Sequence, residues 1–127
     1  MDETTLARLD RESYLSLATK QRSGRWVETP VWFAAHRGRL YVFTEAKAGK
    51  VKRLRNFPEI RVAPCNMRGK VNGAWVEGKG RVVADPAKVE AAYAALHRKY
   101  GWQMWLTDFF SRLTGRIAGR AILELEV

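Results

Sequence analysis

Three strand-like segments follow one another early in the chain, and only short turns separate them. Residues 14–20 alternate apolar and polar side chains, and residues 26–35 and 39–44 are rich in valine and aromatic residues. The turn signals are Arg22-Ser23-Gly24-Arg25 and Arg37-Gly38. Strands joined by so few residues pair antiparallel, because a parallel pair needs a crossover of about a dozen residues or more. This feature predicts an antiparallel meander and argues against a doubly wound parallel sheet.

Three further strand-like segments occur later in the chain. Residues 59–66 are rich in β-branched side chains, residues 75–83 alternate, and residues 120–127 form a mostly apolar run. Gly78 and Gly80 fall on one face of the second segment, which predicts a bulge or a backbone that something else approaches closely. Six antiparallel strands around one core predict a small β-barrel.

Four segments carry helical patterns. Residues 4–11 and 49–56 predict short helices, and residues 86–100 predict a longer helix with Asp85 as its N-cap. A fourth helix is predicted at once after it, where large apolar side chains recur at helical spacing and indicate core or a homodimer interface. Its apolar residues are Trp102, Trp105, Leu106, Phe109, Phe110 and Leu113. The expected fold class is mainly β with α (α+β), an antiparallel barrel with flanking helices.

The length and charge of the chain bound its class. With 127 residues, the chain is predicted to form one domain over residues 1–127, large enough for one sizeable core. Its 23 Lys and Arg residues exceed its 13 Asp and Glu residues and give a net charge of +10. Such a surplus favours an anionic partner, which could be nucleic acid, a membrane surface, or a phosphorylated or carboxylated small molecule.

The expected location of the protein is the cytoplasm. No apolar run approaches the roughly 18 residues of a membrane helix, so no membrane partner is expected. The acidic start of the chain, Met1–Thr4, differs from a secretory signal. Cys65 is the only cysteine, which excludes an internal disulfide.

Motifs for several kinds of chemistry are missing from the sequence. It contains neither a P-loop nor a GxGxxG fingerprint. His36 and His97 lack acidic partners at ligand spacing, so no metal site is expected. No serine lies in a nucleophile elbow, and no catalytic residue can be named. An enzyme of this kind leaves its chemistry to a bound cofactor.

The run Gly49-Lys50-Val51-Lys52-Arg53 is the strongest local candidate for a binding site. A glycine at a helix start leaves the backbone amides accessible, and those amides and the helix dipole attract an anion. Lys50 and Arg53 share one flank of the helix and add positive charge. The alternative interpretation is a solvated basic helix face.

The run Thr29-Pro30-Val31-Trp32-Phe33 is a second candidate. Proline removes one donor from the strand ladder, so Pro30 marks a strand edge or a bulge. Unpaired amides near such a break could bind the carbonyl groups of a planar heterocycle. An edge strand with packed aromatic side chains explains the pattern equally well.

Six motifs, taken in order, resemble those of a known family. They are Tyr14–Thr19, Gly24-Arg25, Thr29–Phe33, Leu40–Thr44, Gly49–Leu54 and Trp75–Gly78. Their order and spacing are similar to the pyridoxamine 5′-phosphate oxidase-like superfamily, and more closely to its F420-dependent oxidoreductases, the B-type flavin/deazaflavin oxidoreductases. The resemblance runs from about Leu9 to Leu125.

The resemblance implies a split β-barrel that forms a homodimer with two cofactor sites at the subunit interface. One strand would lie along the cofactor ring, a strand end and a helix would hold the cofactor phosphate, and a further strand would approach from the partner subunit. The corresponding residues here are Thr29, Pro30, Val31 and Trp32 for the ring; Val42, Phe43, Thr44, Lys50, Lys52 and Arg53 for the phosphate; and Trp75 and Gly78 for the approaching strand.

The expected function is that of an oxidoreductase. It would transfer a hydride between the deazaflavin coenzyme F420, or alternatively FMN, and an unidentified small organic substrate. Pyridoxamine phosphate oxidases carry a substrate-binding His and Arg near their C-terminus, and this chain lacks that pair, so oxidation of vitamin B6 is not expected.

Two alternatives lie outside catalysis. A small barrel can bind nucleic acid, with Tyr41 and Phe43 stacking on bases and Arg39 contacting phosphate. The clustering of basic residues on one short helix argues against this. The other alternative is a carrier of a cofactor or small molecule without catalysis.

Overall fold

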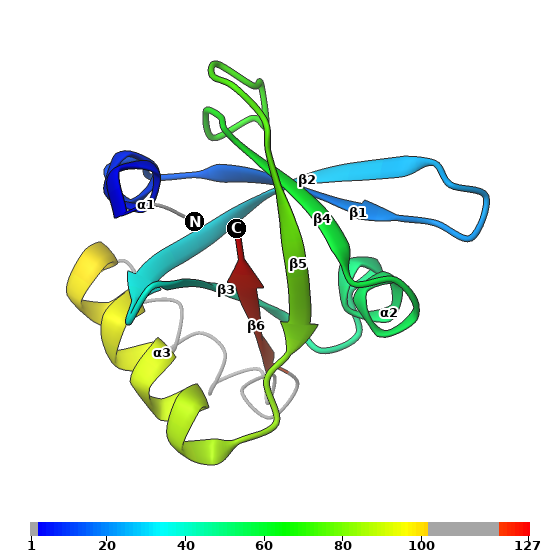
Figure 1. Ribbon diagram of the computed structural model, residues 1–127. Coiled ribbons are helices and arrows are strands. Elements are labelled where there is room, and N and C mark those ends of the chain that lie inside the picture. Colours follow the sequence, from blue (N-terminus) through cyan, green and yellow to red (C-terminus); the bar gives the residue numbers. More distant parts are fainter. Residues whose placement is uncertain (1–2, 102–119) are drawn as a thin grey trace.

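The structure, a computed structural model, describes residues 3–101 and 120–127. The described residues form a closed barrel of six antiparallel strands in the order β1-β2-β3-β6-β5-β4 (Figure 1), and β4 pairs with β1 to close it. The strands are β1 Leu15–Lys20, β2 Trp26–His36, β3 Arg39–Glu45, β4 Glu59–Pro64, β5 Val76–Val82 and β6 Arg120–Glu126. The predicted fold class is therefore confirmed.

Within the described residues, three helices flank the barrel: α1 Glu3–Asp10, α2 Gly49–Asn56 and α3 Pro86–Tyr100. Leu9 of α1 and Val51 and Leu54 of α2 extend the core of the barrel interior. Helix α3 lies along the outside of the barrel, where it covers a second apolar cluster that includes residues of β2, β3 and β6. Both faces of these strands are buried there.

The ends of two predicted segments differ from the structure. Strand β4 ends at Pro64, and the chain then turns because the side chain of Asn66 accepts hydrogen bonds from the amides of Arg68 and Lys70. Trp75, predicted to open β5, lies just before it. The predicted fourth helix, residues 102–113, lies outside the described residues.

Strand β2 changes partners along its length. It pairs with β1 from Trp26 to Val31 and with β3 from Trp32 to His36. In the described part of the chain, no residue of β2 is therefore paired with a neighbouring strand on both of its edges. Strand β3 leaves β2 and leads directly into α2, so the barrel is split where α2 begins.

The glycines of β5 make room for the chain's own last strand. A Cβ atom on Gly78 would lie 2.3 Å from the carbonyl oxygen of Glu126, and one on Gly80 would lie 3.0 Å from Cδ2 of Leu125. The predicted close approach is therefore confirmed, and the structure identifies β6 as the approaching element.

Candidate cofactor site

Helix α2 begins without a side-chain cap. Its N-cap residue, Ala48, is extended and offers no side-chain oxygen, so its carbonyl oxygen meets only the amide of Val51, at 3.1 Å, and the first turn contains no acidic residue. Gly49 leaves space that the Arg53 guanidinium fills, because Nη1 of Arg53 lies 2.7 Å from where a Cβ atom would stand. The helix start therefore combines uncapped amides with a cation folded back over them, which suits an anion.

Two cations of α2 are bound to hydroxyl groups of neighbouring strands. Nζ of Lys50 donates to Oγ1 of Thr44 on β3 at 3.3 Å, and Nε of Arg53 donates to Oγ1 of Thr19 on β1 at 2.6 Å. Both threonines are buried. Since β2 lies between β1 and β3 in the barrel, α2 spans the end of the barrel where β2 is split from β3.

The charges of Lys50 and Arg53 are only partly solvated. Burial lowers the pKa of Lys50, the charge of Arg53 lowers it further, and Glu45 partly opposes the change. Burial also lowers the pKa of Arg53. A hydroxyl satisfies a donor but does not neutralise its charge, so a bound anion would stabilise this pair. The solvated-face interpretation fits Lys52 and Arg55, which are exposed, and not these two.

Thr29 has a buried hydroxyl that no group among residues 3–101 and 120–127 satisfies. Its Oγ1 makes no hydrogen bond in the described part of the protein, although it is inaccessible to solvent. Its side chain shares the strand face of Val31 and Phe33, which belong to the barrel core. A buried unsatisfied hydroxyl costs about 1–3 kcal/mol. A polar ligand atom or a water molecule at the split would satisfy it.

The remaining residues predicted for the cofactor ring and phosphate differ in which of their atoms can reach a ligand. The side chains of Val31 and Val42 are buried in the barrel core, so only their main chain can reach a ligand. Trp32 stacks on Tyr100 of α3 with ring centroids 4.6 Å apart. Phe43 packs edge-on against Tyr93. Pro30 is exposed beside the partner change.

Within one chain, Trp75 lies away from helix α2. Trp75 is 40% exposed and lies just before β5. Helix α2 packs further along this strand, near Gly80: a Cβ atom built on Gly80 would lie 3.2 Å from Cδ2 of Leu54. Five strand residues separate the two positions by about 16 Å. An exposed tryptophan at this place suits contact with another molecule, while the open side of Gly78 is already filled by β6.

The surface predicted for base stacking does not exist. Tyr41 is 5% exposed beneath α3, and its hydroxyl donates to Glu124. Phe43 is covered by Tyr93 and by Arg120, whose guanidinium carbon lies 4.7 Å from the Phe43 ring centre. The hypothesis that Tyr41 and Phe43 stack on bases is therefore wrong, because α3 occupies the face that it requires.

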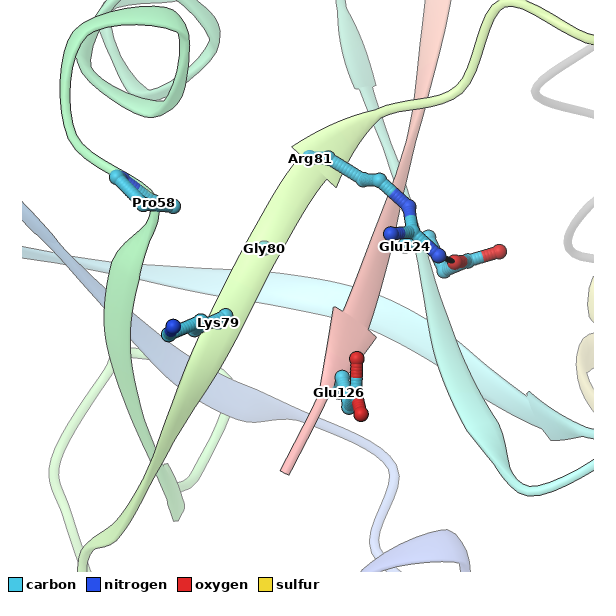
Figure 2. Close-up of a pocket in the computed structure, with 6 residues that line it drawn as sticks. All are labelled: Pro58, Lys79, Gly80, Arg81, Glu124 and Glu126. Atoms are coloured by element: carbon cyan, nitrogen blue, oxygen red, sulfur yellow. Dashed lines mark hydrogen bonds and ion pairs between the residues drawn. The ribbon is translucent and has the colours of Figure 1, made fainter.

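A separate cavity of about 260 Å³ lies beside β5 and β6, and Figure 2 shows the residues that line it. Its charged lining residues are Lys79, Arg81, Glu124 and Glu126. Two bases and two acids balance, so this cavity lacks the positive excess that a phosphate needs. The α2 end of the barrel is the better anion site.

Glu124 is the buried centre of that cavity's charge cluster, and sequence reasoning did not identify it. It accepts hydrogen bonds from the Tyr41 hydroxyl at 2.8 Å, from Nζ of Lys88 at 3.3 Å, and from Arg81. Burial alone would raise the pKa of Glu124, but these hydrogen bonds outweigh it and lower the pKa below 4.5. An acidic residue in the apolar run Ile122–Leu125 was the available signal.

Glu124→Gln is expected to destabilise the protein by about 1–2 kcal/mol near pH 7, a range kept low because Arg81 and Lys88 are largely exposed. The lowered pKa stabilises the fold above 4.5, and this contribution disappears as pH falls through the folded-state pKa. Urea unfolding of wild type and variant should therefore converge as the pH falls below 4.5. Exposed Glu126→Gln is the control, and a pH-independent difference would contradict the assignment.

The closed barrel with a split beside α2, and the uncapped basic helix start, define a class of split-barrel proteins. The family profile described as pyridoxamine 5′-phosphate oxidase matches residues 1–127, and the chain belongs to this family. A search of functionally curated proteins finds no match. Among the described residues, no helix is long and apolar enough to cross a membrane.

Solved structures share the fold at low sequence identity. A conserved hypothetical protein from Mycobacterium tuberculosis is 19% identical with a TM-score of 0.71, and the alignment covers 98% of this chain and 79% of that one. An F420 reductase is 20% identical with a TM-score of 0.62, covering 98% and 94%. The haem storage protein HutZ from Vibrio cholerae is 14% identical with a TM-score of 0.70, covering 97% and 87%.

Proposed function

We propose that this protein is an oxidoreductase that transfers a hydride between F420 and a small organic substrate, with FMN as the alternative cofactor. The observation that carries the proposal is the pair of partly buried cations, Lys50 and Arg53, at the uncapped start of α2. Both cofactors carry a phosphate that would neutralise this pair. Membership of the family and the likeness to an F420 reductase support the choice of cofactor class.

The residues of this chain would bind and orient the cofactor, whose ring supplies the hydride chemistry when bound. Lys50, Arg53 and the first amides of α2 would hold the phosphate, and exposed Lys52 would add a weaker attraction. The hydroxyl of Thr29 would gain the hydrogen-bond partner that it lacks. The main chain around Pro30 and Trp32 would face the carbonyl edge of the ring. No proton donor is assigned, and solvent can fill that role.

A pair of cofactor titrations tests the proposal. Four exposed cations would attract the oligoglutamate tail that F420 has and FMN lacks: Lys47 and Arg55 before and on α2, and Arg68 and Lys70 on the loop between β4 and β5. Arg61 of β4 is not among them, because its guanidinium pairs with Glu77 at 3.5 Å. F420 should bind more tightly than FMN at about 20 mM salt, and the gap should narrow at about 300 mM, where the Debye length falls below about 10 Å.

Fluorescence of the cofactor ring measures both affinities. Tighter binding of FMN at both salt concentrations would make FMN the cofactor. Failure of both cofactors to bind would refute the proposed function. Protein purified with bound nucleic acid and without either cofactor would favour the nucleic-acid alternative.

The protein is expected to be a homodimer. The resemblance implies a cofactor site at a subunit interface, and exposed Trp75 and Met67 would offer apolar contacts there. Light scattering at low micromolar concentration should give twice the chain mass of 14.5 kDa. An obligate interface buries more than about 2,000 Å² in total. A monomer that binds cofactor at full affinity would contradict the interface site.

A further inference from the structure

Beyond Val31, strand β2 continues without β1 beside it, so this edge of β2 needs other hydrogen-bond partners. The ladder between these strands ends at the pair Leu15–Val31. The same register, continued by two residues, would pair Ser13 with Phe33. The hydroxyl of Tyr100, the last residue of α3, lies between them instead.

The Tyr100 hydroxyl takes the place of the backbone hydrogen bonds that β1 would otherwise make to Phe33. The amide of Phe33 donates to it at 3.0 Å, and the hydroxyl lies 3.0 Å from the Phe33 carbonyl oxygen and 2.9 Å from the Ser13 carbonyl oxygen. Its single proton can serve one of these two carbonyls at a time. Burial raises the pKa of Tyr100 to about 12, so this proton is retained at physiological pH.

Two residues further along the same edge of β2, a second side chain satisfies the backbone. The amide of Ala35 donates to Oδ1 of Asp10, the last residue of α1, at 3.1 Å. Nζ of Lys99 binds the same oxygen at 3.3 Å and lies 3.4 Å from the ring centre of Phe33. The ends of α1 and α3 together therefore replace β1 along this part of β2.

Tyr100 also fixes the side chain next to the partner change. Its ring stacks on Trp32 at an interplanar angle of 10°. One residue thus holds the main chain at Phe33 and the side chain at Trp32, directly after Thr29–Val31. Residues 29–31 pair with β1 along one edge, and their opposite edge faces the split.

We propose that Tyr100 is a positioning residue that sets where β2 leaves β1 and so holds Thr29–Trp32 in place for the cofactor. The proposal rests on the proposed function of this segment. Tyr100 itself touches main chain and Trp32 rather than the cofactor. Its role would be to keep the unsatisfied Thr29 hydroxyl and the neighbouring main chain in binding geometry.

The test compares Tyr100→Phe with Tyr41→Phe. Each variant deletes one tyrosine hydroxyl that is hydrogen-bonded within the chain, and Tyr100→Phe keeps a ring that can stack on Trp32. The hydroxyl of Tyr41 binds Glu124, away from the split. Both variants should have a lower melting temperature than wild type. Tyr100→Phe should raise the dissociation constants for FMN and F420 at least tenfold, while Tyr41→Phe should stay within about twofold of wild type.

Amide hydrogen exchange provides a readout that needs no cofactor. Residues 29–33 should exchange faster in Tyr100→Phe than in Tyr41→Phe when the two are compared at equal global stability. Equal exchange there, or cofactor affinity within twofold of wild type, overturns the positioning role. If wild type binds neither FMN nor F420, the proposed function fails, and exchange alone then decides whether Tyr100 positions β2.

Discussion

Lys50→Met is expected to weaken the binding of F420 or FMN by roughly 10- to 100-fold, about 1.5–3 kcal/mol, the value of a charge-assisted hydrogen bond to phosphate. The Nζ atom of Lys50 is held by Thr44 at the start of α2, where the helix amides add to its field. Methionine keeps the length and the apolar packing of the side chain and removes only the charge and its donors. Cofactor titration by fluorescence measures the change.

The same variant should leave the protein without cofactor at least as stable as wild type. Burial and the neighbouring charge of Arg53 lower the pKa of Lys50, so its charge disfavours the folded state. That penalty is present at neutral pH and disappears as pH rises through the lowered pKa towards 10.5. Wild type and variant should therefore converge in urea midpoint at high pH.

Lys52→Met supplies the matched comparison on the same helix. Its side chain is exposed, and an exposed charge contributes little and is screened by salt. Its effect on affinity should stay below about threefold and vanish as salt is raised. Equal losses in the two variants would mean that the helix acts through its overall charge rather than through a built phosphate site.

Gly78→Ala is expected to destabilise the protein by about 1–3 kcal/mol, the cost of adding a methyl group to a filled space. The added Cβ atom would meet the Glu126 carbonyl oxygen and Val127, so the end of β6 must move. Gly80→Ala should cost less, because the atoms it meets are the ends of the Leu125, Leu54 and Ile60 side chains. Urea unfolding gives both values, and an unchanged stability in Gly78→Ala would contradict this packing.

Features that depend on neighbouring residues could be predicted from the sequence. Asp85 accepts a hydrogen bond from the amide of Ala87 at the start of α3, as an N-cap residue does. Gly24 and Gly38 take the positive φ angles that tight turns require. The helix start at Gly49 was found in the same way, since its glycine and its basic residues lie within one turn.

Features that depend on distant residues could not be predicted. The burial of Tyr41 arises from α3, and the cluster around Glu124 joins β3, β5, β6 and α3. Tyr100 replaces the backbone hydrogen bonds of a neighbouring strand only because the end of α3 reaches β2. No short-range pattern reports such contacts, and an exposed aromatic strand and a covered one have the same sequence pattern. The hypothesis of a stacking surface was wrong for this reason.

The position of β6 between β3 and β5 determines when the barrel can close during synthesis. Residues 15–82 can already form the sheet of β4, β1, β2 and β3 with β5, but β3 and β5 keep bare edges until residues 120–126 emerge. Unpaired edges recruit other strands, so the nascent chain is most prone to aggregate just before its last strand is made. A messenger RNA cut short after the codon for Tyr100 would yield an open sheet and leave α3 without Ile122 beneath it.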